Sequence, residues 1–351
     1  MNIREIKEKY SVNNRQLSVV TGIPMRSLQQ WEKGERKPPE YIYGLIESAL
    51  ERNVVVRRGA PVLIGHTPTV SASRVNSILM KDFCALTRED VEELNRAYHA
   101  QILEEAARKD TGGIYKCTQV KLAYNSNKIE GNRMTVDDAT LFFETGIVPD
   151  GECRPKDVEE MRGHFVMFNN AMRGFYSPLA EDTIKRYHYD LQCGVFEFIS
   201  NGYRPGEYKS KENTVAGITT SSPVNVARDM AELLADYGSF SGSPVENIAL
   251  FHCRYETIHP FQDGNGRTGR MVLFKEAFAQ GAAPVIISDE KKKEYRAALR
   301  SYQETASESA LAVFLESCQE EFYEVLRKYM YDHSVPLSYV CEGEEEMGNE
   351  R

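Results

Sequence analysis

Apolar residues recur at steps of three and four along most of the chain from about residue 90 to residue 332. This spacing is typical of α-helices that bury one face, so we expect an all-α domain over 90–332. The chain has 351 residues, which suits two domains, a small one and a larger one with an ample core. No internal repeat is evident.

Two predicted helices enclose a glycine-rich segment, HPFQDGNGRTGR, at residues 259–270. The segment before it, NIALFHCRYETI, places four apolar residues on one helix face: Ile248, Phe251, Tyr255 and Ile258. The segment after it, TGRMVLFKEAFAQG, also has a helical pattern, which we expect to stop at Gly281. The glycines therefore lie in a loop between two helices.

The letters GNGRTG in this loop fit the pattern G-x-G-x-x-G of a dinucleotide-binding turn. That turn needs a buried strand before the glycines, and the pattern here is helical. Asp289 lies about 20 residues beyond the glycines, where a ribose-binding acid is expected, so the acid alone does not discriminate. The missing strand argues against a dinucleotide site.

The loop has the chemistry of an anion site. Gly264 and Gly266 allow backbone conformations closed to other residues, so consecutive amides can point into one concavity at the start of the second helix. Arg267 and Arg270 lie three residues apart on that helix, so both guanidinium groups can bind one phosphate chain.

Two further residues of the loop suit phosphate chemistry. Asp263 offers a carboxylate oxygen of the kind that Mg²⁺ prefers beside phosphates. His259, with an ordinary pKa near ~6.5, suits a general base at neutral pH. A rival metal site of His252, His259 and Asp263 is set aside, because seven helical residues separate the histidines by ~10 Å.

The run from His259 to Arg270 resembles the signature H-P-F-x-D-G-N-G-R-x-x-R of the Fic family at every position. Fic proteins are all-α and mostly transfer AMP from ATP to a Ser, Thr or Tyr hydroxyl of a target protein. The resemblance covers essentially the whole predicted domain, and it implies a protein adenylyltransferase that uses ATP and Mg²⁺ to modify a target protein or itself.

The resemblance also implies a role for each loop residue. His259 would deprotonate the attacking hydroxyl, and Asp263 would hold Mg²⁺ on the phosphates. Phe261 would pack in the core. A relative that phosphorylates its target has lysine in place of Gly266, so adenylylation is favoured, although the motif leaves other nucleotidyl or phosphocholine donors open. The ATP-binding residues would be Gly264, Asn265, Gly266, Arg267 and Arg270.

The segment SNKIEGN, at residues 126–132, is predicted to end a helix that spans roughly residues 115–132. Ile129 continues the apolar face of this helix, and Gly131 suits the position just after a helix end. On its own, the segment would indicate nothing more than a solvated charge at a helix terminus.

The same segment resembles the Fic inhibitory motif S/T-x-x-x-E-G/N, with Ser126 and Glu130 in the required places. In the family this glutamate pairs with the second loop arginine, here Arg270, and occupies the space that the γ-phosphate needs. The resemblance therefore implies an autoinhibited enzyme. In some relatives the same glutamate also helps to remove AMP from the modified protein.

Residues 204–226 are rich in Gly, Ser, Thr and Pro and resemble the flap on which Fic relatives dock a target by strand pairing. Lys209 stands where many relatives have arginine, and its role is left open. Tyr295 either lines an adenine pocket or packs between helices. A short β-hairpin is expected at Thr214, Val215, Ala216, Gly217 and Ile218.

Residues 1–50 resemble a Cro or phage-repressor type of helix-turn-helix domain, with a second helix beginning at Met25. They carry eight Lys and Arg against six Asp and Glu, so tight binding to a DNA operator needs a homodimer or a protein partner. Docking of a protein is the alternative role. The expected core is Leu17, Ile23, Leu28 and Trp31, and the expected base-reading residues are Arg26, Ser27, Gln29 and Gln30.

The remaining segments and the composition set limits. Residues 51–89 read as a connector, and the acidic tail at 333–351 is expected to be disordered. The net charge of −9 argues against a general nucleic-acid coat. Seven cysteines without a C-x-x-C pair indicate reduced thiols, and neither a membrane span nor a signal peptide is evident, so we expect a cytoplasmic protein.

We therefore expect a cytoplasmic, autoinhibited AMP transferase fused to a helix-turn-helix domain. The alternative is a DNA-binding transcriptional regulator whose Fic domain acts as a nucleotide sensor. The sequence names neither the target protein nor the signal that relieves inhibition by Glu130.

Overall fold

The computed structural model describes residues 70–333, apart from 109, 111, 149–152 and 216–217. Of the first 69 residues it describes 3–10, 14, 17, 23, 25–35, 37, 38, 43, 46, 54–57 and 60–63. The chain divides into two compact units, Met1–Thr69 and Val70–Arg351.

The small unit contains two described helices, α1 (Ile3–Tyr10) and α3 (Met25–Lys33). They are joined by an ion pair of 2.6 Å between Lys7 Nζ and Glu32 Oε1. Its core includes the four residues expected from the sequence, of which Leu17 and Leu28 are buried and Ile23 and Trp31 pack against them. The unit also has an antiparallel pair of strands, β1 (Val54–Arg57) and β2 (Ala60–Leu63).

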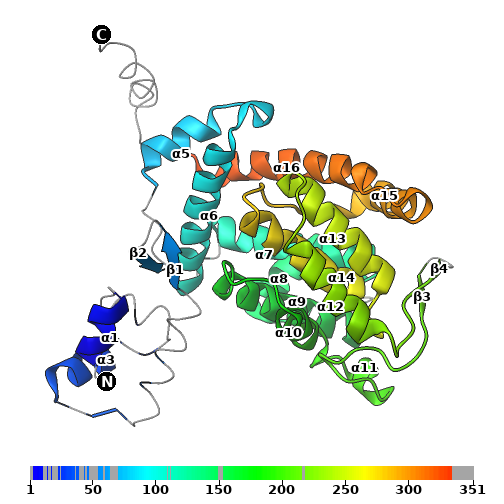
Figure 1. Cartoon of the computed structure of the whole chain (residues 1–351), viewed down its shortest axis with the longest axis horizontal. Helices are drawn as coiled ribbons and strands as arrows, with labels where there is room; N and C mark the ends of the chain where they lie inside the picture. Colours follow the sequence, from blue (N-terminus) through cyan, green and yellow to red (C-terminus); the bar gives the residue numbers. More distant parts are fainter. Residues whose placement is uncertain are drawn as a thin grey trace. The chain divides into compact units, whose positions relative to one another are not determined.

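The large unit is built almost entirely of helices in the part that the structure describes, as the periodicity predicts (Figure 1). Its only strands there are β3 (Thr214–Val215) and β4 (Ile218–Thr219), which pair antiparallel. The short 3₁₀ turns are η1 (Phe83–Ala85) and η2 (Asp289–Lys291). The helices are α5 (Ala72–Leu79), α6 (Arg88–Arg108), α7 (Ile114–Ile129), α8 (Val136–Thr145), α9 (Pro155–Arg173), α10 (Glu181–Gln192), α11 (Phe196–Ser200), α12 (Val226–Tyr237), α13 (Pro244–Ile258), α14 (Asn265–Ala279), α15 (Lys292–Thr305) and α16 (Ser309–Met330).

Local sequence explains where the helices nearest the loop begin and end. Helix α13 starts with Ser243 in a capping box with Glu246, which satisfies amides that have no partner within the helix. Helix α7 ends before Gly131, which has φ 91°, and Gly281 follows α14 with φ 75°, so both expected glycine stops are confirmed.

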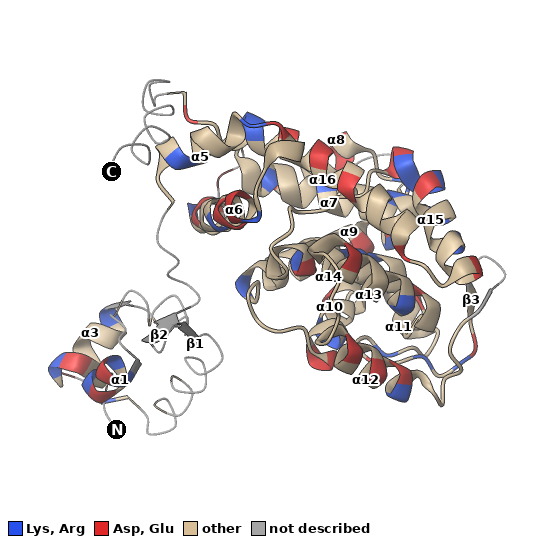
Figure 2. Ribbon diagram, turned by 45° about the horizontal axis from the view of Figure 1, so that its top comes forward, with Lys and Arg blue, Asp and Glu red and all other residues tan. Residues whose placement is uncertain are grey.

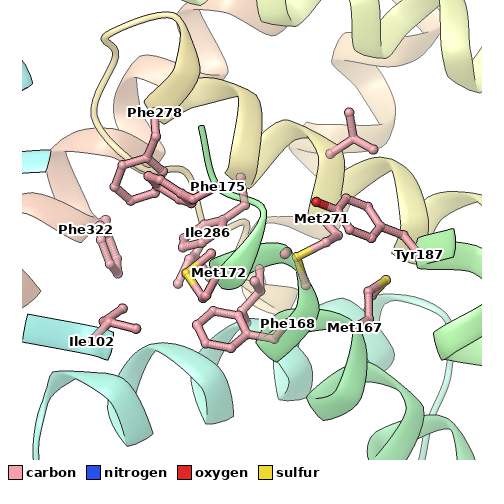
Figure 3. Packing of buried hydrophobic residues seen from close by; sticks show 14 of the residues in the cluster. Ile102, Met167, Phe168, Met172, Phe175, Tyr187, Met271, Phe278, Ile286 and Phe322 are labelled. Carbon is pink, nitrogen blue, oxygen red and sulfur yellow. The ribbon is translucent and has the colours of Figure 1, made fainter. Parts of the chain in front are cut away.

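Helix α14 lies at the centre of the large unit and is buried along nearly its whole length. It packs against α7, α9, α10 and α13, so the loop that precedes it is surrounded by helices. Figure 3 shows aromatic and methionine side chains, including Phe168, Met172 and Phe278, packed in the main core. Charged side chains of both signs lie along an outer helix, α12 (Figure 2).

The predicted connector at 51–89 is divided between the two units. Residues 70–89 belong to the large unit, because α5 buries Val75, Ile78 and Leu79 in the main core. The sequence pattern does not predict this helix, because its few apolar residues lie among Ser and Asn residues. Residues 334–351 of the predicted acidic tail lie outside the described residues. No described helix is long and apolar enough to cross a membrane.

Candidate active site

The glycine-rich loop joins two helices, and no strand precedes it. Helix α13 runs to Ile258, and His259 caps it in the left-handed conformation with φ 52°. Gly264, with φ 80°, then begins α14. The helix–loop–helix expectation is therefore confirmed, and a dinucleotide-binding turn is excluded.

Asn265 fixes the shape of the loop through its side chain. Its Oδ1 accepts a hydrogen bond of 2.7 Å from Phe261 N, and its Nδ2 donates one of 2.7 Å to Phe261 O. The Phe261 ring is fully buried and stacks on His188, with ring centroids 3.9 Å apart. Asn265 thus pins the loop with its side chain in addition to offering a backbone amide.

His188, on whose ring Phe261 stacks, also supports the loop. Burial lowers its pKa to about 3, so the ring is neutral and has one N–H. Gly206 N donates to Nδ1 over 2.9 Å, so the proton is on Nε2, which donates to the backbone carbonyl of Asp263 over 3.0 Å. The orientation of the ring and its tautomer are therefore fixed.

The two loop arginines are buried at the N-terminal end of α14. Arg267 NH1 lies 2.6 Å from Glu160 Oε1, and Arg267 NH2 lies 3.1 Å from Asp263 Oδ1. Burial alone would lower the pKa of Arg267, but these carboxylates raise it above its usual value. The first amides of a helix have no intrahelical acceptor, so residues 265–267 and the two guanidinium groups together form an anion site.

Ser126, in α7, and Glu130, which directly follows α7, both contact Arg270. Glu130 Oε1 accepts a hydrogen bond of 2.8 Å from Arg270 NH2. Arg270 Nε also donates to Ser126 Oγ over 3.0 Å, and Arg270 NH2 donates to Ser126 O over 2.8 Å. A Cβ added at Gly266 would lie 2.4 Å from Glu130 Oε1, so the absent side chain makes room for this carboxylate.

Asp263 is the partly exposed carboxylate of the loop. Its Oδ1 accepts from Gly264 N over 2.6 Å, and its Oδ2 lies 3.6 Å from Lys156 Nζ. Burial raises the pKa of Asp263, but Arg267 and Lys156 outweigh this and lower it below its ordinary value. Among the residues that the structure describes, no group of three or more His, Cys, Asp and Glu side chains could hold a metal by itself.

His259 is oriented by a buried carboxylate on its own helix. Its Nδ1 lies 3.6 Å from Glu256 Oε2, while Glu256 Oε1 lies 3.9 Å from His252 Nε2. Burial raises the pKa of Glu256, but the neighbouring His259 and His252 and the charge of Arg270 lower it below its usual value. Because Nδ1 faces this carboxylate, Nε2 is the nitrogen available to a substrate.

Tyr295 is buried in the wall of the same cavity. Its hydroxyl lies 2.7 Å from His252 Nε2, and its ring lies 5.9 Å from the Arg270 guanidinium carbon. The cavity has a volume of about 130 Å³ and is lined by the loop together with Glu130, Tyr295 and Leu299. Pockets for small molecules usually measure roughly 300–1,000 Å³, so with Glu130 in place this cavity is small for a ligand site.

The other predicted residues are not among those that line this cavity, or they lie outside the described residues. Thr214, Val215 and Ile218 are in the hairpin of β3 and β4, whereas Ala216 and Gly217 lie outside the described residues. In α3, Arg26 and Gln29 are exposed and Ser27 and Gln30 are partly exposed.

Four residues near the loop have no counterpart in the sequence prediction, and His188 is one of them. Glu256 is three residues before His259, so helical spacing alone could have indicated it. Glu160 and Lys156 reach the loop from α9, and no local pattern identifies either of them.

Comparisons with known proteins agree with this geometry. Residues 178–276 match the family model of the Fic/DOC family. The protein adenylyltransferase fic-1 of Caenorhabditis elegans is 26% identical over 214 residues, covering 59% of this chain and 40% of that protein. The protein adenylyltransferase Fic of Drosophila willistoni is 31% identical over 179 residues, covering 49% of this chain and 34% of that protein. The chain thus spans less than half the length of these curated relatives.

A solved structure has the same helical fold. A Fic domain containing signaling protein from Bacteroides thetaiotaomicron aligns with a TM-score of 0.55 and 25% identity, over 68% of this chain and 96% of that one. Residues 178–276 are thus similar to the Fic/DOC family in sequence, and the large unit is similar in fold to a Fic domain containing protein.

Proposed function

We propose that this protein is an adenylyltransferase that moves AMP from ATP to a hydroxyl group of a target protein or of itself. The observation that carries the proposal is the cavity in which two buried arginines, the N-terminal end of α14 and His259 come together. The names of the curated relatives support AMP as the transferred group.

In this proposal the chain supplies positioning and charge. His259 Nε2 accepts the proton of the target hydroxyl, whose oxygen attacks the α-phosphorus of ATP as the bond to pyrophosphate breaks. Arg267 and Arg270 hold the departing pyrophosphate. Asp263 would hold Mg²⁺, which would neutralise phosphate charge. One carboxylate fits this ion, because Mg²⁺ at phosphates takes most of its ligands from substrate and water.

We also propose that Glu130 inhibits the resting enzyme. Its carboxylate already binds Arg270, which the γ-phosphate would need, and the remaining cavity of about 130 Å³ is small for a ligand site. To convert a 1:99 mixture of open and blocked forms into a 99:1 mixture takes roughly 5.5 kcal/mol of differential binding. Glu130→Gly removes the carboxylate that holds the blocked form on Arg270, so this substitution shifts the mixture toward the open form.

The test compares wild type, Glu130→Gly and Glu130→Gly/His259→Ala, each incubated with α-labelled ATP and Mg²⁺. Label on the protein or on a lysate is expected only with Glu130→Gly, at tenfold or more above wild type. Absence of label in all samples would refute adenylyl transfer, and equal label in wild type would refute inhibition. Loss of label after wild type is added back would assign AMP removal to Glu130 as well.

A second candidate function rests on the small unit. Helix α3 buries Leu28 and exposes Arg26 and Gln29, which is the arrangement a recognition helix needs to reach base edges. We propose that this unit binds a DNA operator and that the nucleotide state of the large unit controls it. Affinity for the operator should then depend on ATP and should be unchanged by His259→Ala. It should fall with Gln29→Ala, and operator binding that is unchanged by Gln29→Ala would refute this second function.

A further inference from the structure

Lys209 is a buried lysine whose ammonium group joins three separate segments. Its side chain is only 3% exposed. The Nζ donates to Asn213 Oδ1 over 2.7 Å, to Thr220 Oγ1 over 2.7 Å and to Ile258 O over 3.3 Å. An ammonium group has three donors, so this arrangement satisfies all of them.

Two of these acceptors lie at the base of the hairpin. Asn213 directly precedes β3 and Thr220 directly follows β4, while Thr214 pairs with Thr219 between them. The Thr220 hydroxyl also lies 3.0 Å from Asn213 O, so both ends of the hairpin meet at the ammonium group. Lys209 therefore closes the base of the hairpin.

The remaining contacts of Lys209 lie on both sides of His259. The ammonium group binds the carbonyl of Ile258, and the backbone N–H of Lys209 donates to Pro260 O over 2.8 Å. Asn213 adds a hydrogen bond of 3.0 Å from Nδ2 to Phe261 O. The two ends of the hairpin are thus fixed to the carbonyl groups that precede and follow His259, the candidate general base.

We propose that Lys209 is a positioning residue that couples the hairpin to His259, so that a hydroxyl group presented on the hairpin reaches Nε2. This inference rests on the proposed transfer reaction. Burial and contacts distinguish Lys209 from Lys211, which is exposed and whose Nζ lies 5.1 Å from the centre of the Tyr203 ring. Burial lowers the pKa of Lys209 to about 8, so its three acceptors hold a cation that is costly to leave unpaired.

The experiment places Lys209→Met, Lys209→Arg and the control Lys211→Met in the full-length Glu130→Gly protein. Three quantities are measured: ATP binding, ATP hydrolysis in which water is the acceptor, and AMP transfer to protein hydroxyls. With Lys209→Met we expect protein labelling to fall at least tenfold, while ATP affinity and hydrolysis stay within twofold. Lys209→Arg should restore most of the labelling, and Lys211→Met should match the parent. A parallel fall in all three quantities, or unchanged labelling, would overturn the coupling.

A measurement without catalysis separates this inference from the proposed function. In the Lys209→Met variant, amide hydrogen exchange should rise both in residues 211–215 and in residues 259–263. In the Lys211→Met variant, it should rise in neither segment. If the parent protein transfers no AMP, adenylyl transfer fails, but the exchange result still decides the coupling. A rise in hydrogen exchange confined to one of the two segments would overturn the coupling between the hairpin and His259.

Discussion

Acidification from pH 7 to pH 5 is expected to remove about 6 kcal/mol from the free energy of unfolding of the large unit. The main cause is a set of three histidines buried in the neutral form, and His99, whose pKa burial also lowers, acts in the same direction. Burial lowers the pKa of His164 and of His188 to about 3 and that of His252 to about 4. For His164, the positive charges of the two loop arginines lower the pKa further.

The sign and size follow from proton linkage. In the unfolded chain each histidine has its ordinary pKa of 6.5. Between pH 6.5 and about pH 4 the unfolded state therefore binds protons that the native state does not, so stability falls as the pH falls. Each histidine contributes about 2 kcal/mol of loss between pH 7 and pH 5. The sum rivals the whole stability of a typical domain, roughly 5–15 kcal/mol.

Urea unfolding followed by circular dichroism at pH 7, 6 and 5 measures this loss. The single tryptophan, Trp31, is in the small unit, so its fluorescence reports that unit separately. His164→Gln removes one titrating group and should reduce the loss by about 2 kcal/mol. His333→Gln, an exposed control, should follow wild type. Parallel pH dependences for wild type and His164→Gln would refute the reasoning.

Three substitutions test other contacts. Gly163→Ala places a Cβ 2.3 Å from the backbone oxygen of Leu191, so chemical denaturation should show a loss of about 3 kcal/mol, and an unchanged midpoint would contradict this packing. Asn265→Ala leaves the buried N–H and C=O of Phe261 unpaired and should destabilise the fold by about 3 kcal/mol in the same assay, whereas a loss below about 0.5 kcal/mol would count against the pinning role. Ser126→Ala removes one hydrogen bond to the second loop arginine, worth about 1 kcal/mol, so basal self-labelling should rise about fivefold; equal labelling would contradict this.

The parts of the site that sequence predicts are those with a local physical cause. Apolar steps of three and four stop at Ile258 because α13 stops there, and the left-handed positions at Gly131 and Gly281 mark helix ends. Anion-binding residues within one turn of α14 are likewise neighbours in sequence. Such features need no knowledge of how distant helices pack.

The remaining features depend on packing between distant segments. Glu160 meets Arg267 from α9, more than 100 residues earlier in the chain, and only tertiary structure brings them together. Lys209 has the same character, because its three acceptors come from both ends of a hairpin and from α13. Helix α5 escapes prediction since its apolar positions are too few for a clear period.

The absence of a side chain at Gly266 restricts which mutations can relieve the proposed inhibition by Glu130. The Glu130 carboxylate fills the space beside it, and under the proposed function a terminal phosphate would enter the same space. A side chain added there would collide with the Glu130 carboxylate and with Arg270, so under the proposed function substitutions at this glycine are expected to reduce transfer from ATP as well as inhibition. Under the proposed function, constitutively active variants arise through changes at the C-terminal end of α7, and a genetic selection for activity should recover them at Ser126 and at Glu130, which directly follows the helix.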